Sequence, residues 1–252
     1  MKLMTRTFLF VTLTTFLLPQ SEAAQKNPSY FLIGNSLTWD TVPPKLDGDV
    51  QWHVDCGKPL AYIHGNPAKP CVKTSTLWPE ALKNKQYDYI SVQPHYGGTF
   101  KTDTETISKW MTLQPKAIFV IHSGWPRHES RAEEWVDTDT RGKMHHSPAY
   151  VDALIAELRK RHPGRKFRVT RTQDLVNQVA NDIKAGKAPW KDVSEIYRDK
   201  IHMNVVTGRY LVHNAMRHAM GQRRSSQGFE KLDPELKAYF DSVLDTLPSP
   251  DA

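Results

Sequence analysis

The residues best suited to chemistry in this chain are a serine near its start and an aspartate–histidine pair near its end. Ser36 lies in the run Gly34-Asn35-Ser36-Leu37-Thr38, and Asp199 precedes His202 by three residues. A serine hydroxyl becomes a nucleophile when a histidine accepts its proton, and a carboxylate on the other ring nitrogen orients that histidine. The pattern predicts a triad in which Ser36 is the nucleophile, His202 the base and Asp199 the orienting acid. By spacing alone, Asp-x-x-His also fits a helix start with a surface histidine.

The nucleophile requires an element that presents it on a turn. Residues 29–33 have the apolar, β-branched and aromatic content of a buried strand, and Gly34 ends that strand. Further strands are predicted from four other short apolar runs, at 50–54, 87–92, 117–121 and 167–170.

Helical patterns lie between and after these runs. They cover 102–113, 147–162, 172–185, 204 to about 220, and a last stretch that begins at Asp233. Asn204 is predicted to cap the fourth of these helices. Strands that alternate with helices favour a mainly parallel sheet covered on both faces. Ligands bind beyond the carboxyl ends of such strands, and polar or glycine-rich segments follow four of them, at Ser36, at 56–57, at 93–98 and at 122–125.

The first 23 residues are predicted to be a signal peptide that is removed on export. A basic start is followed by a short apolar run and by small residues at Ser21 and Ala23. The run is too short to span a bilayer, so no stable membrane insertion is expected. We expect residues 24–252 to form a single domain, in which 220–252 supply a linker and the C-terminal helix, and the protein to be secreted or periplasmic.

The net charge of the chain is +7. The basic residues are dispersed and are not interleaved with aromatic residues as in a nucleic-acid groove, so no nucleic-acid partner is predicted. In an exported chain the two cysteines, Cys56 and Cys71, predict a disulfide. His95, His122 and His128 lack a tight ligand spacing, so no metal and no cofactor is predicted.

Two segments carry a family resemblance. The run 34–38 resembles the first block of the SGNH (GDSL-type) serine hydrolases, and Asp199-Lys200-Ile201-His202, with the following run 208–211, resembles their last block. The order of nucleophile, acid and base also fits, and the similarity extends in blocks over about residues 29–220. The resemblance implies a three-layer α/β/α sandwich of flavodoxin-like type and esterase-type acyl transfer.

The resemblance also implies an oxyanion hole made by the backbone amide of the nucleophile, a glycine and an asparagine. Ser36 supplies the amide, and Gly57 is the candidate glycine, with Gly97 and Gly98 as competitors. The third block departs from the family pattern because no G-x-N-D run occurs, and Gln93 stands where the asparagine is expected. A glutamine amide can donate a hydrogen bond to an oxyanion.

Aromatic and histidine side chains on the same loops are candidates for substrate binding. They are Trp39, His95, Tyr96 and Trp125. Trp39 and Trp125 could form a stacking platform for a sugar ring, or they could simply pack in the interior. The sequence therefore predicts an exported serine esterase. Its substrate is expected to be an ester of a small acyl group, most specifically acetyl, on a small molecule or a polysaccharide. The alternatives are a lipase or lysophospholipase, and a non-catalytic glycan-binding protein on the same fold.

Overall fold

A computed structural model of the chain describes residues 27–140 and 146–250. The predicted signal peptide lies outside the described residues. Five parallel strands form one sheet in the order β2-β1-β3-β4-β5, which is the flavodoxin-like order. The strands are β1 (Ser29–Gly34), β2 (Asp49–Val54), β3 (Tyr89–Val92), β4 (Ile118–Ile121) and β5 (Phe167–Val169). The five-stranded parallel sheet predicted from the sequence is confirmed.

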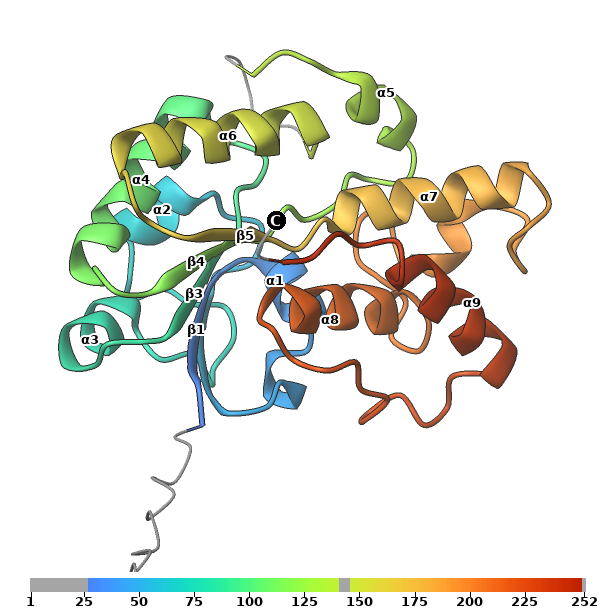
Figure 1. The fold of residues 1–252 in the computed structure, drawn as a ribbon, viewed down its shortest axis with the longest axis horizontal. Helices are drawn as coiled ribbons and strands as arrows, with labels where there is room; N and C mark the ends of the chain where they lie inside the picture. The colour runs from blue at the N-terminus through green and yellow to red at the C-terminus, as the bar shows by residue number, and fades with distance from the viewer. Residues whose placement is uncertain (1–26, 141–145, 251–252) are drawn as a thin grey trace, which may run out of the picture.

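Helices cover both faces of the sheet and complete a three-layer α/β/α sandwich (Figure 1). One layer contains α2 (Leu60–Gly65), α3 (Trp78–Asn84), α4 (Phe100–Leu113) and α6 (Pro148–Arg161). The other contains α1 (Ser36–Asp40), α7 (Thr172–Lys184), α8 (Gly208–Ala219) and α9 (Pro234–Leu244). A short helix, α5 (Arg131–Val136), contacts α7, and two 3-10 turns are found at Pro43–Lys45 and Val193–Ile196.

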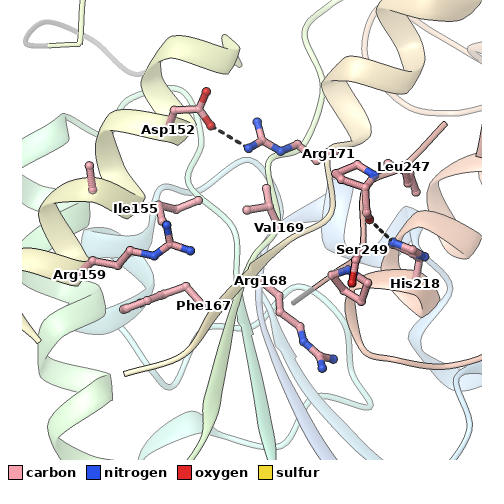
Figure 2. A pocket seen from close by; sticks show the side chains of 13 residues that line it. Asp152, Ile155, Arg159, Phe167, Arg168, Val169, Arg171, His218, Leu247 and Ser249 are labelled. Carbon is pink, nitrogen blue, oxygen red and sulfur yellow. Dashed lines mark hydrogen bonds and ion pairs between the residues drawn. The ribbon is translucent and has the colours of Figure 1, made fainter. Parts of the chain in front are cut away.

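Among the described residues, strand β5 is an edge of the sheet and pairs with β4 alone. Its open side borders a hollow that lies between α6 and residues 247–250 near the C-terminus (Figure 2). Within the described residues, no helix is both long and apolar enough to cross a membrane.

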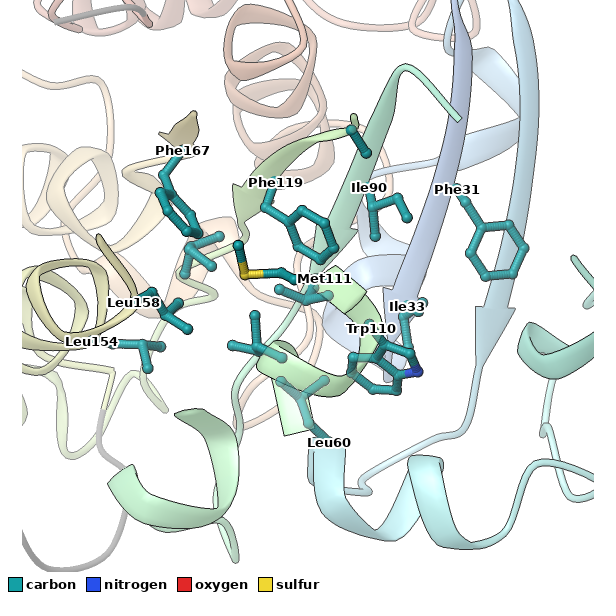
Figure 3. Close-up of a cluster of buried hydrophobic side chains, with 14 of the residues drawn as sticks. Phe31, Ile33, Leu60, Ile90, Trp110, Met111, Phe119, Leu154, Leu158 and Phe167 are labelled. Carbon is teal, nitrogen blue, oxygen red and sulfur yellow. The ribbon is translucent and has the colours of Figure 1, made fainter. Parts of the chain in front are cut away.

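The sheet is buried on both faces because its strands alternate between two cores. Phe31 and Ile33 of β1 face a core shared with α4 and α6 (Figure 3), whereas Tyr30 and Leu32 face α8. All four side chains are at most 3% exposed. Burial of both faces explains why β1 reads as a continuous apolar run in the sequence.

The start of α8 differs from the prediction. Asn204 does not cap the helix, because its Oδ1 accepts hydrogen bonds from the backbone N–H groups of Val206 and Thr207 in a preceding turn. The helix begins only at Gly208, where a Cβ would collide with the carbonyl oxygen of Ile196. The intervening turn directs the chain from the Asp199–His202 segment back into the core.

Candidate active site

Ser36 is the first residue of α1, directly beyond the carboxyl end of β1. Asn35 caps this helix, since its Oδ1 accepts the backbone N–H of Leu37 at 3.0 Å. Gly34 has no room for a side chain, because a Cβ there would lie 2.9 Å from Cβ of Gln93. The strand, the glycine and the cap therefore place the serine hydroxyl at the edge of the sheet. A helix of five residues is too short to be recognised from periodicity, so the sequence does not predict α1.

The three predicted triad residues lie together and form one hydrogen-bonded chain. His202 Nε2 is 2.8 Å from Ser36 Oγ, and His202 Nδ1 is 2.8 Å from Asp199 Oδ2. The histidine is partly exposed, with 27% of its side chain accessible. A substrate can therefore approach the serine–histidine pair from solvent.

Asp199 and His202 do not lie on a helical turn, although their spacing fits one. They belong to a loop closed at its base by an antiparallel bridge between Tyr197 and Met203. Asp199 Oδ1 accepts the backbone N–H groups of Ile201 at 3.0 Å and of His202 at 2.8 Å, which folds the loop around the carboxylate. The same carboxylate thus shapes the loop and holds the imidazole.

The electrostatics of this loop favour an ionised aspartate. Burial opposes ionisation, but hydrogen bonds from the backbone of His202 and Ile201 and from the His202 imidazole outweigh it and lower the pKa of Asp199 to about 2. An ionised Asp199 requires a proton on His202 Nδ1, and this leaves Nε2 free to accept the Ser36 proton.

Asp40 joins the helix that carries Ser36 to the Asp199–His202 loop and was not identified from the sequence. It is fully buried at the end of α1, and its Oδ2 accepts the backbone N–H of Met203 at 2.8 Å. Its Oδ1 accepts from Arg198 at 2.9 Å and from Arg209 at 2.7 and 3.0 Å. Arg198 in turn donates to the carbonyl oxygen of Met203 at 2.6 Å. The residue next to His202 is therefore fixed through both of its backbone polar groups to the helix that carries Ser36.

Trp125 supports the triad loop from within. Its side chain is fully buried, and its Nε1 donates to the carbonyl oxygen of Ile201 at 2.6 Å. Nearby, the backbone N–H of His128 donates to the carbonyl oxygen of Lys200 at 3.1 Å. A fully buried ring offers no face to a sugar, so the platform interpretation of Trp125 is wrong and the packing interpretation holds.

Gln93 lies directly beneath the nucleophile turn. Its Oε1 accepts the backbone N–H groups of Asn35 at 3.2 Å and Thr38 at 2.9 Å, and the Thr38 hydroxyl at 2.8 Å. Its Nε2 is buried and has no hydrogen-bond partner within residues 27–140 and 146–250. Gln93 therefore orders the backbone around Ser36, and its part in an oxyanion hole stays a prediction.

Gly57 lies on the exposed turn after β2, with φ of 67°, in the left-handed region that favours glycine. The adjacent Cys56 forms a disulfide with Cys71, as the sequence predicted. Gly57 is therefore held near the carboxyl edge of the sheet, and its role as an oxyanion donor also stays a prediction.

Three other candidates for substrate contact differ in exposure. Trp39 is half-buried, and its ring centroid lies 5.8 Å from that of Trp52. Tyr96 is half-buried and donates its hydroxyl hydrogen to Glu134 Oε1 at 2.6 Å. His95 is almost fully buried, at 7% exposure, with its Nδ1 3.3 Å from Nε2 of His146. Trp39 and Tyr96 thus keep accessible surface, whereas His95 keeps little.

His95 is a neutral group in this environment. Burial, followed by the charges of His146, Arg127 and His202, lowers its pKa to about 3. His95 lies in the loop after β3, and Ser36 follows β1, so both are at the carboxyl edge of the sheet. In the described part of the chain, no cluster of three or more His, Cys, Asp or Glu side chains could hold a metal ion.

No protein-family model matches the sequence, and no curated protein matches it. Among solved structures, a Parabacteroides merdae protein described as a GDSL-like lipase is 12% identical, with a TM-score of 0.49, over 79% of this chain and 97% of that one. Phospholipase A1 from Streptomyces albidoflavus is 9% identical, with a TM-score of 0.36, over 70% of this chain and 92% of that one. A family two carbohydrate esterase from Cellvibrio japonicus is 14% identical, with a TM-score of 0.34, over 60% of this chain and 54% of that one. The match therefore spans about half the length of the esterase. All three are distant likenesses.

Proposed function

We propose that this chain is an exported serine esterase of the SGNH type, which removes a small acyl group, most simply acetyl, from a carbohydrate. The observation that carries the proposal is the continuous hydrogen-bonded chain Asp199–His202–Ser36. These are the three residue types that activate a serine nucleophile, and they come from segments more than 160 residues apart. A protein that only binds glycans has no need of this arrangement.

The geometry supports a two-step acyl transfer. Ser36 Oγ attacks the ester carbonyl carbon while His202 Nε2 takes the hydroxyl proton, and the carbonyl oxygen becomes an oxyanion. The N–H of Ser36, at the start of α1, is the proposed donor to that oxyanion, together with Gly57 and Gln93. His202 then returns the proton to the leaving alcohol oxygen, and water repeats the sequence on the acyl-enzyme to release the acid.

The surroundings of the triad support a polar substrate over a lipid. The loop after β3, at the same edge of the sheet as Ser36, carries His95 and Tyr96, each of which makes a side-chain hydrogen bond. Among the described residues, the exposed large hydrophobic side chains are Leu113, Val136 and Val205. Only Val205 is near the triad in sequence, and one valine does not make the broad apolar groove that an acyl chain requires.

The disulfide supports export. Bridges such as Cys56–Cys71 persist in oxidising compartments and are rare in the cytosol. The predicted signal peptide, residues 1–23, lies outside the described residues, so export rests on the sequence pattern and on this bridge.

The first experiment compares the hydrolysis of p-nitrophenyl acetate, butyrate and octanoate by the mature chain, by Ser36→Ala and by Ser242→Ala. Ser242 is an exposed serine on α9 and serves as the matched control. We expect turnover selective for acetate, lost by about 10⁴-fold or more in Ser36→Ala and retained in Ser242→Ala. A preference for octanoate would move the function to lipids.

Labelling by a serine-directed phosphonate separates an enzyme from a binding protein. A stoichiometric mass increase in the wild type that disappears in Ser36→Ala supports the esterase. If folded wild-type protein shows neither labelling nor turnover, the catalytic proposal fails and the glycan-binding alternative replaces it.

A further inference from the structure

The outer edge of β5 carries a second surface, distinct from the triad, whose charge is strongly one-sided. Two adjoining hollows, of about 400 Å³ and about 540 Å³, share Arg159, Phe167 and Arg168 as walls. Together they form a groove along the open edge of the sheet, which we term the β5 groove. Its charged lining residues are Asp152, Arg159, Arg165, Lys166, Arg168 and Arg171.

Among the described residues that line the groove, five side chains are cationic and Asp152 is the carboxylate. Asp152 lies 2.9 Å from Arg171 and is used by that ion pair (Figure 2). Arg165 is held by the carbonyl oxygens of Met111, Gln114 and Ala117, at 2.7 to 3.2 Å. Carbonyl oxygens orient a guanidinium but leave its net charge in place, so the hollow at Arg165 stays positive.

Arg159 and Lys166 are the two exposed cations of the groove. Within the described residues neither has a carboxylate within 4.0 Å, so their charges face solvent uncompensated. Arg159 projects from α6 toward the opening, and Phe167 lies beside it as an apolar floor (Figure 2). Arginine forks on an apolar floor suit carboxylates that are borne on a ring.

The groove leads toward the carboxyl edge of the sheet, where the triad lies. Arg171 follows Thr170, whose Oγ1 is 3.0 Å from His122 Nδ1 and accepts the backbone N–H of Ser123 at 3.1 Å. Three strand spacings separate β5 from β1, which carries Ser36, and this corresponds to about 14 Å across the sheet. A linear polymer that lies in the groove can therefore extend toward the nucleophile.

We propose that the β5 groove binds an acidic polysaccharide, a chain of uronate-type sugars, and retains the polymer whose ester the triad hydrolyses. The choice of a polysaccharide rests on the proposed function, whereas the preference for a polyanion rests on the charges of the groove. A polymer held in this way raises the local concentration of its esters at Ser36.

The test is direct binding of unesterified polygalacturonate to the full mature chain in 50 mM salt. The paired variant Arg159→Glu with Lys166→Glu removes the uncompensated charges. Lys73→Glu with Lys231→Glu changes the net charge equally at exposed lysines elsewhere. We expect the groove variant to bind about 10- to 30-fold more weakly, and the slope of log Kd against log salt to fall by about 0.7 to 0.9 for each ion pair with the polymer that is removed. The control variant should bind within threefold of the wild type.

The outcomes are separable from those of the esterase assay, because this polymer carries no ester and its binding needs no turnover. Equal weakening in both paired variants would show that only net charge matters and would overturn the groove. Absence of binding by the wild type, or equal binding of neutral dextran, would also overturn it. Tighter binding of a 20-bp DNA duplex would overturn the assignment to a polysaccharide.

Discussion

Replacing Asp40 by Asn tests whether the two catalytic segments are held together by one buried carboxylate. The carboxylate accepts hydrogen bonds from Met203, Arg198 and Arg209 and has no exposure to solvent. An asparagine has one oxygen and one N–H₂ group, so either the backbone N–H of Met203 or the two arginines would face an N–H₂ donor in place of an acceptor. Removing one partner of a buried ion pair costs about 3–5 kcal/mol. Because typical domains are stable by only about 5–15 kcal/mol, this loss is large.

The same change should reduce catalysis at temperatures where the variant is still folded. Met203 follows His202, so its release allows the imidazole to move relative to Ser36, and a displacement of about 1 Å can cost about 100-fold in rate. We expect kcat for p-nitrophenyl acetate to fall about 10- to 100-fold, with a smaller change in KM.

Urea unfolding and steady-state kinetics at low temperature measure both effects in Asp40→Asn. The matched control is Asp245→Asn, which removes an exposed ion pair with Arg224 and should cost less than about 1 kcal/mol. If Asp40→Asn unfolds within 1 kcal/mol of the wild type and keeps kcat within threefold, Asp40 does not fix the triad, and the reasoning above is refuted.

Two further predictions concern stability. Burial raises the pKa of Asp103 to about 7, with Tyr150 donating to it at 2.7 Å, so the folded protein keeps a proton that the unfolded chain releases from about pH 4 upward. The free energy of unfolding should therefore fall by up to about 4 kcal/mol from pH 4 to pH 8 because of this group. Asp103→Asn should lessen that fall. Urea titrations in which the wild type and Asp103→Asn show the same pH dependence would contradict this prediction. Replacing Cys56 and Cys71 together by Ser should cost about 3 kcal/mol for a bridge that spans 15 residues, measured as a lower Tm, and reductant should lower the wild-type Tm equally.

The strands and long helices could be predicted because they depend on patterns local in sequence. Buried parallel strands such as β1 are continuously apolar, and α6 and α7 carry stripes at helical spacing. The start of α8 could not be placed, since the Asn204 side chain accepts its hydrogen bonds within a turn that precedes the helix. Short elements such as α1 have too few residues for a periodic signal.

Residue types and their order along the chain were enough to predict a triad of Ser36, His202 and Asp199, from a serine that follows a strand ended by glycine and an aspartate three residues before a histidine. How the triad is held became visible only in the folded chain. The burial of Asp40 against two arginines, the use of Gln93 Oε1 by the nucleophile turn and the burial of Trp125 depend on segments that are far apart in sequence. Local pattern does not encode such interactions, because whether a polar or aromatic side chain is buried depends on which segments the folded chain brings against it.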